Sequence, residues 1–311
     1  MRKFGVPYWG LSRVFGKDPM YWYRIVTGLG RNSVVGTTVR SAGVLPDDLL
    51  ADEKHLKLGG EKIYVATTVA KDCCLGAEVA GGAGTDELTE AYRVFHDEAK
   101  DIDPDYTPKT VNTDGWSATQ SAWKALFPRI AVIQCFLHAF LKIRNRAKHL
   151  GDLFWTIGEK VWDAYHAPNR RSFSQRIRSL KHWAANTLTA GPAKDKVLDL
   201  CKKRSRWSVA YDYPTAHRTS NMLDRLMRFM DRYFFDGQHL HGSQEASNLG
   251  CRAWALLWNF APSHPRVVAA HEGRQSPAER LNRQKYHDCW LQNLLVSASM
   301  GGYRTAPQKP R

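Results

Sequence analysis

The spacing of hydrophobic residues separates a region of predicted strands and helices, residues 50–138, from a longer helical region after it. In the first region, short runs rich in β-branched and aromatic residues end at turn signals such as Gly59-Gly60, which is typical of strands. Segments with helical spacing separate the later runs. The predicted strands cover residues 50–58, 62–70, 73–80, 107–114 and 129–138, and the predicted helices cover 85–100 and 116–127.

The resulting order of elements is βββ-α-β-α-β. Three strands joined by tight turns form an antiparallel meander, and the later alternation of helices with strands favours parallel pairing. The order predicts an α/β fold with one mixed five-stranded sheet and helices on its faces. Beyond it we expect an all-helical region over about 139–215, a helix near 219–235, a polar loop near 262–277 and a last helix through 284–295.

The two ends of the chain differ from its middle. Residues 1–45 hold seven bases and one acid, with short helices predicted near 8–16 and 19–28, where Pro19 suits a first helical turn. This basic segment fits either the remnant of a helix-turn-helix or an arm packed on the core. At the other end, residues 301–311 have the composition of a disordered tail.

The net charge of +15 indicates a polyanionic partner, because lysines and arginines gain affinity by releasing counterions from phosphates. The charge is uneven, since residues 46–105 hold 15 acids and 6 bases whereas residues 139–232 hold 20 bases and 8 acids. An acidic sheet region beside a basic helical region suits a site that holds cations and the phosphates they bridge. Two ordinary solvated faces would give the same counts.

Other features of composition bear on the compartment. No run of about 18 apolar residues occurs, and the first residues lack the apolar stretch of a signal peptide, so we expect a soluble protein with no membrane partner. The six cysteines are scattered and form no pair of CxxC motifs. This usage favours reduced thiols in the cytoplasm, with the protein on the nucleoid if the cell is bacterial.

Two aspartates occupy positions that suit metal binding. Asp52 lies within the first predicted strand, and Asp114 ends the fourth strand directly before Gly115. Binding sites in open α/β sheets gather at the carboxyl ends of strands, so neighbouring first and fourth strands would bring both side chains to one hard cation such as Mg²⁺. An Asp-Gly pair is also an ordinary turn, and this alternative stays open for Asp114.

Four segments, in order, resemble DDE transposases of bacterial insertion sequences, and the second resembles their Mutator-like branch in particular. DEKHLKLGGEKIYV is similar to the first-strand motif, and NTDGWSATQSAWKALFPRIAVIQCFLH is similar to the second motif, in which Asp-Gly begins a helix and Cys-x-x-His follows the next strand. HRTSNMLDRLMR is similar to the third motif, Thr-Ser-Asn-x-x-Glu-Arg, and QSPAERLN to the C-terminal end of such enzymes. The resemblance covers roughly residues 46–300.

The resemblance implies a ribonuclease-H-like catalytic domain over residues 46–300, with the helical region 139–215 as an insertion that grips DNA. It also implies a metal-binding triad of Asp52, Asp114 and Asp224. At the third position this chain departs from the family, because Asp224 stands where a glutamate is usual. The side chain of Asp224 is one methylene shorter, so its helix must approach the other two carboxylates more closely.

Further residues belong to the same predicted site. Glu53 follows the first aspartate, and the resemblance places Cys135 and His138 beside the active site. A cysteine and a histidine alone do not complete a zinc site, so zinc is the weaker interpretation of that pair. Asn221 shares a polar helix face with the third aspartate. Glu245 and Asp231 are the substitutes for the third carboxylate.

The function that the resemblance implies is DNA transposition. Two Mg²⁺ or Mn²⁺ ions would serve cleavage of double-stranded DNA at the ends of the element, and the freed 3′-hydroxyls would then attack target DNA. Assembly of a homo-oligomer on the DNA is implied as well. Trp207 is a candidate for stacking on an unpaired base, with burial in the helical core as its alternative. The predicted DNA contacts are Arg170, Arg171, Arg176, Arg178, Lys181, Lys202, Lys203, Arg204, Arg206, Arg225 and Arg228.

Two rival functions remain open at this point. The segment before residue 46 is short for such an enzyme, which favours a DNA-binding protein derived from a transposase that no longer cuts. The aspartate at position 224 favours the same rival. A ribonuclease-H-like nuclease that cuts RNA hybrids is the other.

Overall fold

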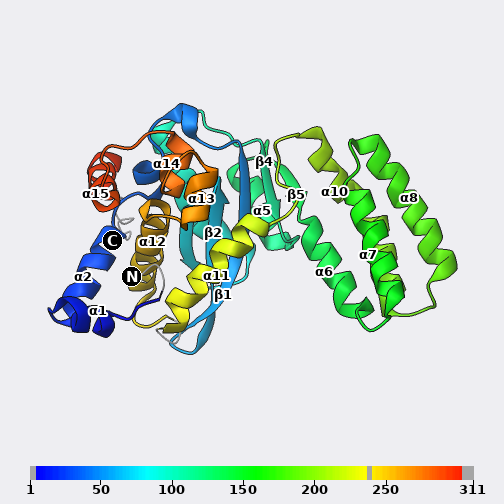
Figure 1. Ribbon diagram of the computed structural model, residues 1–311, viewed down its shortest axis with the longest axis horizontal. Coiled ribbons are helices and arrows are strands. Elements are labelled where there is room, and N and C mark those ends of the chain that lie inside the picture. The colour runs from blue at the N-terminus through cyan, green and yellow to red at the C-terminus, as the bar shows by residue number, and fades with distance from the viewer. Residues whose placement is uncertain (1–4, 237–239, 303–311) are drawn as a thin grey trace.

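The computed structural model describes residues 5–236 and 240–302. A central sheet carries helices on both faces, and a separate group of helices extends beyond one edge of the sheet (Figure 1). Among the described residues, no helix combines the length and the apolar character that crossing a membrane requires.

The sheet has five strands in the order β3-β2-β1-β4-β5. Strands β1, β2 and β3 pair antiparallel, whereas β4 pairs parallel with both β1 and β5. The predicted mixed sheet is therefore confirmed. The last two strands are shorter than the predicted ranges 107–114 and 129–138. The bounds are β1 Asp48–Leu58, β2 Glu61–Ala70, β3 Cys73–Ala80, β4 Thr110–Thr113 and β5 Ala131–Gln134.

Helices α4 (Thr85–Ile102) and α5 (Ser117–Leu126) cover one face of the sheet. Their apolar sides contribute Tyr92, Phe95 and Trp123 to a buried core cluster with residues of the strands. Burial of aromatic side chains of this size is a large part of what holds a helix on a sheet.

Helices α11 (Asn221–Asp236) and α12 (Gln244–Phe260) cover the opposite face. Leu223, Met230 and Trp254 lie in a second core cluster with the other sides of the same strands. Helix α11 crosses β1 and α12 lies along β3. The start of α11 is thereby brought over the strand that carries Asp52.

A buried ionic network, the Arg252 network, links α12 to three other elements. The guanidinium of Arg252 donates to Glu78 on β3, to Glu98 on α4 and to the backbone oxygens of Gly30 and Asn32. Both glutamates and the arginine are almost fully buried. Each charge therefore depends on its partners in place of water.

The N-terminal helices pack against this core. Helix α1 (Tyr8–Phe15) contacts α2 (Pro19–Leu29), and α2 contacts α12, while α3 (Val34–Thr38) buries its two valines. A 3₁₀ turn, η2 (Ala42–Val44), leads into β1. Whether α1 and α2 bind DNA stays a prediction.

The helical region after β5 has a hydrophobic core of its own, centred on Phe173 and Ile177. Trp207 is buried within it, contacts Phe136 edge-to-face and donates its indole N–H to the oxygen of Leu200, so it is not free to stack on a base. The elements are α6 (Phe136–Ala147), α7 (Asp152–Tyr165), α8 (Arg170–Thr187), α9 (Pro192–Lys202), α10 (Arg204–Ser208) and the 3₁₀ turn η3 (Val209–Asp212).

The C-terminal part differs from the prediction in two places. The segment expected as a polar loop contains α13 (Pro265–Ala270), and α14 (Pro277–Asn282) follows it. The last helix, α15 (Trp290–Gly301), begins six residues after the expected start at residue 284. Of the predicted disordered tail, residues 303–311 lie outside the described residues.

Candidate metal centre

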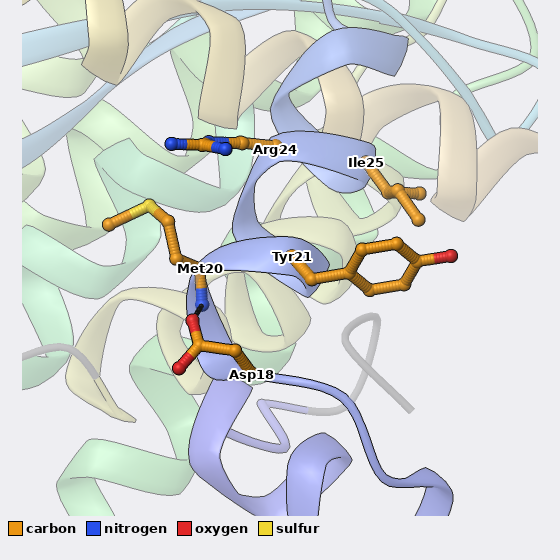
Figure 2. A pocket seen from close by; sticks show the side chains of 5 residues that line it. All are labelled: Asp18, Met20, Tyr21, Arg24 and Ile25. Carbon is orange, nitrogen blue, oxygen red and sulfur yellow. Dashed lines mark hydrogen bonds between the residues drawn. The ribbon is translucent and has the colours of Figure 1, made fainter.

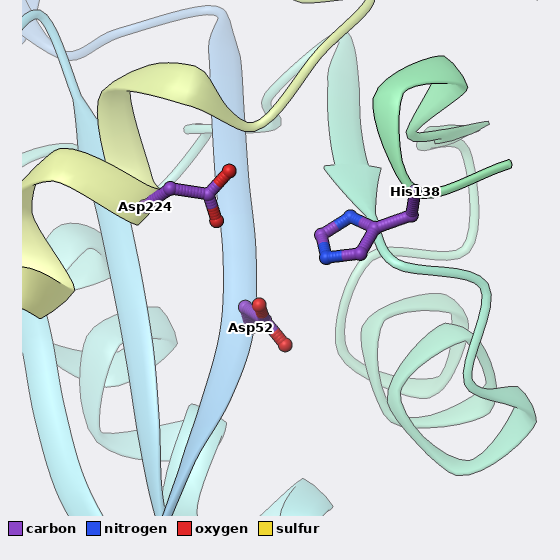
Figure 3. A group of neighbouring side chains, drawn as sticks. All are labelled: Asp52, His138 and Asp224. Carbon is purple, nitrogen blue, oxygen red and sulfur yellow. The ribbon is translucent and has the colours of Figure 1, made fainter. Parts of the chain in front are cut away.

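Three side chains from distant parts of the chain converge beside β1, just beyond the carboxyl ends of β4 and β5. The three residues are Asp52 on β1, His138 in the first turn of α6 and Asp224 in the first turn of α11. Each offers a ligand atom, and these atoms lie within 4.8 Å of one another, so the three residues are called the 4.8 Å group. All three side chains are partly buried, and the imidazole faces the two carboxylates (Figure 3). Two carboxylates and an imidazole are a donor set that divalent metals accept.

Strand pairing explains where Asp114 lies relative to this group. The parallel register of β1 with β4 ends at Leu50 and Asn112, two residues before Asp52 and Asp114, and the two carboxylates are near enough for the charge of Asp114 to raise the pKa of Asp52. The carboxylate of Asp114 accepts the backbone N–H of Trp116 at 2.7 Å, as in a turn, and it is not part of the 4.8 Å group. Asp52 and Asp224 thus lie close together, as expected for two members of the predicted triad, whereas the bond of Asp114 is of the kind that the turn alternative for Asp114-Gly115 implies.

Hydrogen bonds hold the segment before α11 across the carboxyl ends of two strands. The side-chain amide of Asn112, on β4, donates to the oxygen of His217 at 2.8 Å. The backbone N–H of Phe136, just after β5, donates to the oxygen of Arg218 at 3.0 Å. These contacts join residues more than 80 positions apart and bring the start of α11 to the end of the sheet.

Ser220 connects this segment directly to the site. Its hydroxyl donates to Asp224 at 3.0 Å, and its N–H and hydroxyl both lie 3.3 Å from the sulfur of Cys135. The bond to Asp224 orients the shorter carboxylate toward Asp52. Sequence reasoning missed Ser220 as a site residue, although a serine directly before a helix is a common capping residue.

Burial and repulsion among carboxylates make the site favourable for a cation. Burial, followed by the negative charge of Asp114, raises the pKa of Asp52 to about 6. A bound cation would offset both effects, because it supplies positive charge where water is excluded. The donor atoms and the surplus of negative charge thus fit a divalent metal.

Cys135 and His138 form a hydrogen-bonded pair at the start of α6, not at the end of a strand as predicted. The bond with Cys135 raises the pKa of His138 to about 9, although burial acts in the opposite direction. Burial pushes the pKa of Cys135 upward, but bonds with His138 and Ser220 outweigh it and lower the pKa. Cys135 is fully buried and lies outside the 4.8 Å group, and it contacts the site only through its bonds with His138 and Ser220.

Glu53, expected as a neighbour of the site, lies on the opposite face of the sheet because successive residues of a strand alternate. One of its oxygens accepts the hydroxyls of Tyr92 and Thr119, both at 2.7 Å. Burial is the main cause that raises the pKa of Glu53 to about 7. Its carboxyl is therefore part of the core beneath α4 and α5.

The remaining acidic and amide candidates lie outside the group. Asn221 is exposed at the first position of α11, and Asp231 forms an ion pair with Lys54 at 2.5 Å. Glu245 is exposed in the first turn of α12, where its neighbour Gln244 bonds to β3 at the far side of the sheet. Neither substitute for the third carboxylate is thus brought to Asp52.

The predicted DNA contacts fall into two sets. Four bases form ion pairs within the protein, Arg170 with Asp212, Arg176 with Asp163, Lys203 with Asp199 and Arg225 with Asp72. The other bases are exposed and have no ion pair with another described residue, so they are free for phosphates. These are Arg171, Arg178, Lys181, Lys202, Arg204, Arg206 and Arg228.

A surface hollow on α2 does not compete with this site. It is lined by Asp18, Met20, Tyr21, Arg24 and Ile25, which all come from the start of one helix (Figure 2). The carboxylate of Asp18 already accepts the backbone N–H of Met20 at 2.7 Å. The side chains that line the hollow spread apart and present no convergent set of polar groups.

Comparison with known proteins adds no assignment. No protein-family model matches the chain, and no curated protein sequence matches it.

Proposed function

We propose that this protein is a DNA transposase of the DDE type that cuts and joins DNA strands with metal ions held by Asp52, Asp114 and Asp224. The observation that carries the proposal is the approach of Asp52 and Asp224 at the end of the sheet, with Asp114 beside Asp52. The order βββ-α-β-α-β and the mixed sheet are what a ribonuclease-H-like domain requires, and they support the resemblance of the four motifs.

The protein's own residues would position the reacting groups. Ser220 would hold the carboxylate of Asp224, and the parallel pairing of β1 with β4, which ends two residues earlier, would bring Asp52 and Asp114 to the same region. When bound, Mg²⁺ or Mn²⁺ ions supply activation of the attacking water or 3′-hydroxyl and stabilisation of the leaving oxygen. The contact of α11 with β1 would offset the shorter arm of Asp224.

The helical region after β5 would hold the DNA. Its exposed arginines and lysines lie on helices α8, α9 and α10, beyond the edge strand of the sheet (Figure 1). Binding to phosphates along a duplex needs charges of this kind rather than particular base contacts. Assembly of several copies on paired DNA ends belongs to the same proposal.

Metal-dependent cleavage tests the proposal. A labelled duplex carrying the DNA that flanks the gene is incubated with the protein in Mg²⁺, in Mn²⁺ or in EDTA, and the cut strands are mapped. We expect nicks at discrete positions that leave 3′-hydroxyls, only with metal. Asp114→Asn should abolish them, and Asp105→Asn, which changes an exposed carboxylate, should not. Equal background cutting by wild type and Asp114→Asn would overturn the proposal that the protein is an enzyme.

One observation favours the non-catalytic rival. The carboxylate of Asp114 is engaged with the N–H of Trp116 and stands outside the 4.8 Å group, so a protein that only binds DNA is the second candidate. The same assay separates them, since that protein would shift the duplex on a gel and never cut it. Cleavage of an RNA–DNA hybrid without cleavage of the flanking DNA would indicate a ribonuclease.

A further inference from the structure

The imidazole of His138 occupies the position of a third ligand in the site. Its ring approaches Asp52 and Asp224 within the 4.8 Å group, whereas Asp114 does not (Figure 3). His138 comes from α6, so it reaches the site from the side of the helical region, opposite α11. Ligands from three separate elements, β1, α6 and α11, therefore surround one point.

The surroundings of the ring fix its orientation. Nδ1 of His138 lies 3.5 Å from the hydroxyl of Ser220, and the ring also bonds with Cys135. These partners fix the ring while one of its nitrogens stays within the 4.8 Å group. Histidines that bind metals are commonly oriented by a hydrogen-bond partner of the ring.

We propose that His138 is a nitrogen ligand to the metal at this centre and that it makes the site select Mn²⁺ over Mg²⁺. Mg²⁺ demands oxygen ligands in a near-octahedral arrangement, and a nitrogen donor is a poor substitute for one of them. Transition ions accept imidazole and carboxylate together. The inference rests on the proposed function only in the sense that it concerns the same metal centre.

Pulsed electron paramagnetic resonance of the Mn²⁺-loaded protein tests this inference without any measurement of activity. A coordinated imidazole adds nitrogen modulation to the Mn²⁺ echo, and a site of oxygens and water alone does not. We expect the modulation in wild type and in His182→Ala, a matched control on the exposed side of α8. We expect its loss in His138→Ala, whose affinity for Mn²⁺ should fall by about tenfold or more.

A second variant keeps the inference testable if His138→Ala binds no metal at all. His138→Asp restores three ligands but makes all of them oxygens, so it should bind Mn²⁺ without nitrogen modulation. Competition between Mn²⁺ and Mg²⁺ should then move toward Mg²⁺ relative to wild type.

Two outcomes would overturn the inference. One is a wild-type Mn²⁺ echo without nitrogen modulation, and the other is modulation that persists in both His138 variants. Failure of the proposed function is a different result, because nitrogen-ligated Mn²⁺ together with uncut DNA would remove the transposase and leave the ligand in place. Cleavage of DNA by a protein whose Mn²⁺ has only oxygen ligands would keep the transposase and remove His138 as a ligand.

Discussion

Replacing Asp52 by asparagine removes a buried negative charge from the site and should make the metal-free protein more stable. The folded protein holds the pKa of Asp52 at about 6, against its ordinary value of 3.8, mainly because the carboxylate is buried. One pKa unit corresponds to 1.36 kcal/mol, so the ionised carboxylate costs the folded state about 3 kcal/mol at pH 8. The side-chain oxygen of asparagine can keep the bond from the N–H of Glu53.

The sign of the pH dependence follows from proton binding. Between pH values of about 4 and 6 the folded protein binds more protons than the unfolded chain, so its free energy of unfolding falls as pH rises through that window. The advantage of Asp52→Asn should therefore be about 3 kcal/mol at pH 8 and about half of that at pH 5. Below the pKa of Asp52 in the unfolded chain, the carboxyl is neutral in the folded and the unfolded protein, so its burial no longer destabilises the folded state.

Urea denaturation of wild type and Asp52→Asn in EDTA at pH 8 and pH 5 measures these differences. Asp105→Asn serves as a control for removal of an exposed carboxylate. Added Mn²⁺ should raise the stability of wild type and leave Asp52→Asn unchanged, because a ligand stabilises the state that binds it. If Asp52→Asn is less stable than wild type at pH 8, or more stable by the same amount at both pH values, burial of the ionised carboxylate does not destabilise the folded protein.

Three further variants test other parts of the structure. Arg252→Met leaves both glutamates of the Arg252 network buried without a partner, and denaturation should show a loss of about 3–5 kcal/mol. Gly115→Ala places a methyl group against the amide of Gln134 at a positive φ, so thermal melts should show a loss of about 1–3 kcal/mol. Arg171→Gln with Arg178→Gln should weaken binding to any duplex, and reduce the slope of log affinity against log salt by about 0.9 per charge.

Local patterns in the sequence were sufficient for the sheet. The β-branched runs of the first three strands, the glycine turn between β1 and β2, and the acidic first turn of α4 are signals that depend on neighbouring residues alone. The end of β5 was less predictable. The apolar run continues past Gln134, but Phe136 leaves the sheet to join the core of the helical region.

The site itself was only partly predictable. Asp52 and Asp224 could be chosen from motif and helix face, whereas the partners that orient them could not. Ser220 meets Cys135 across 85 positions of the chain, and such long-range contacts leave no local pattern. Likewise, tryptophan is a residue type that stacks on bases, and only the tertiary structure shows that Trp207 lies in the core.

Joining of a pre-cut DNA end tests the central claim most directly, because strand transfer requires the triad and excludes simple binding. A labelled duplex of the flanking DNA with a free 3′-hydroxyl is incubated with plasmid and Mn²⁺, and joined products are counted by sequencing. We expect joining by wild type, and a loss of more than about 100-fold in Asp52→Asn, Asp114→Asn and Asp224→Asn, since lost metal ligands cost several kcal/mol of transition-state stabilisation. Joining that survives in any of these three variants, or its absence from wild type on DNA that the protein binds, would show that the three aspartates do not form a strand-transfer site.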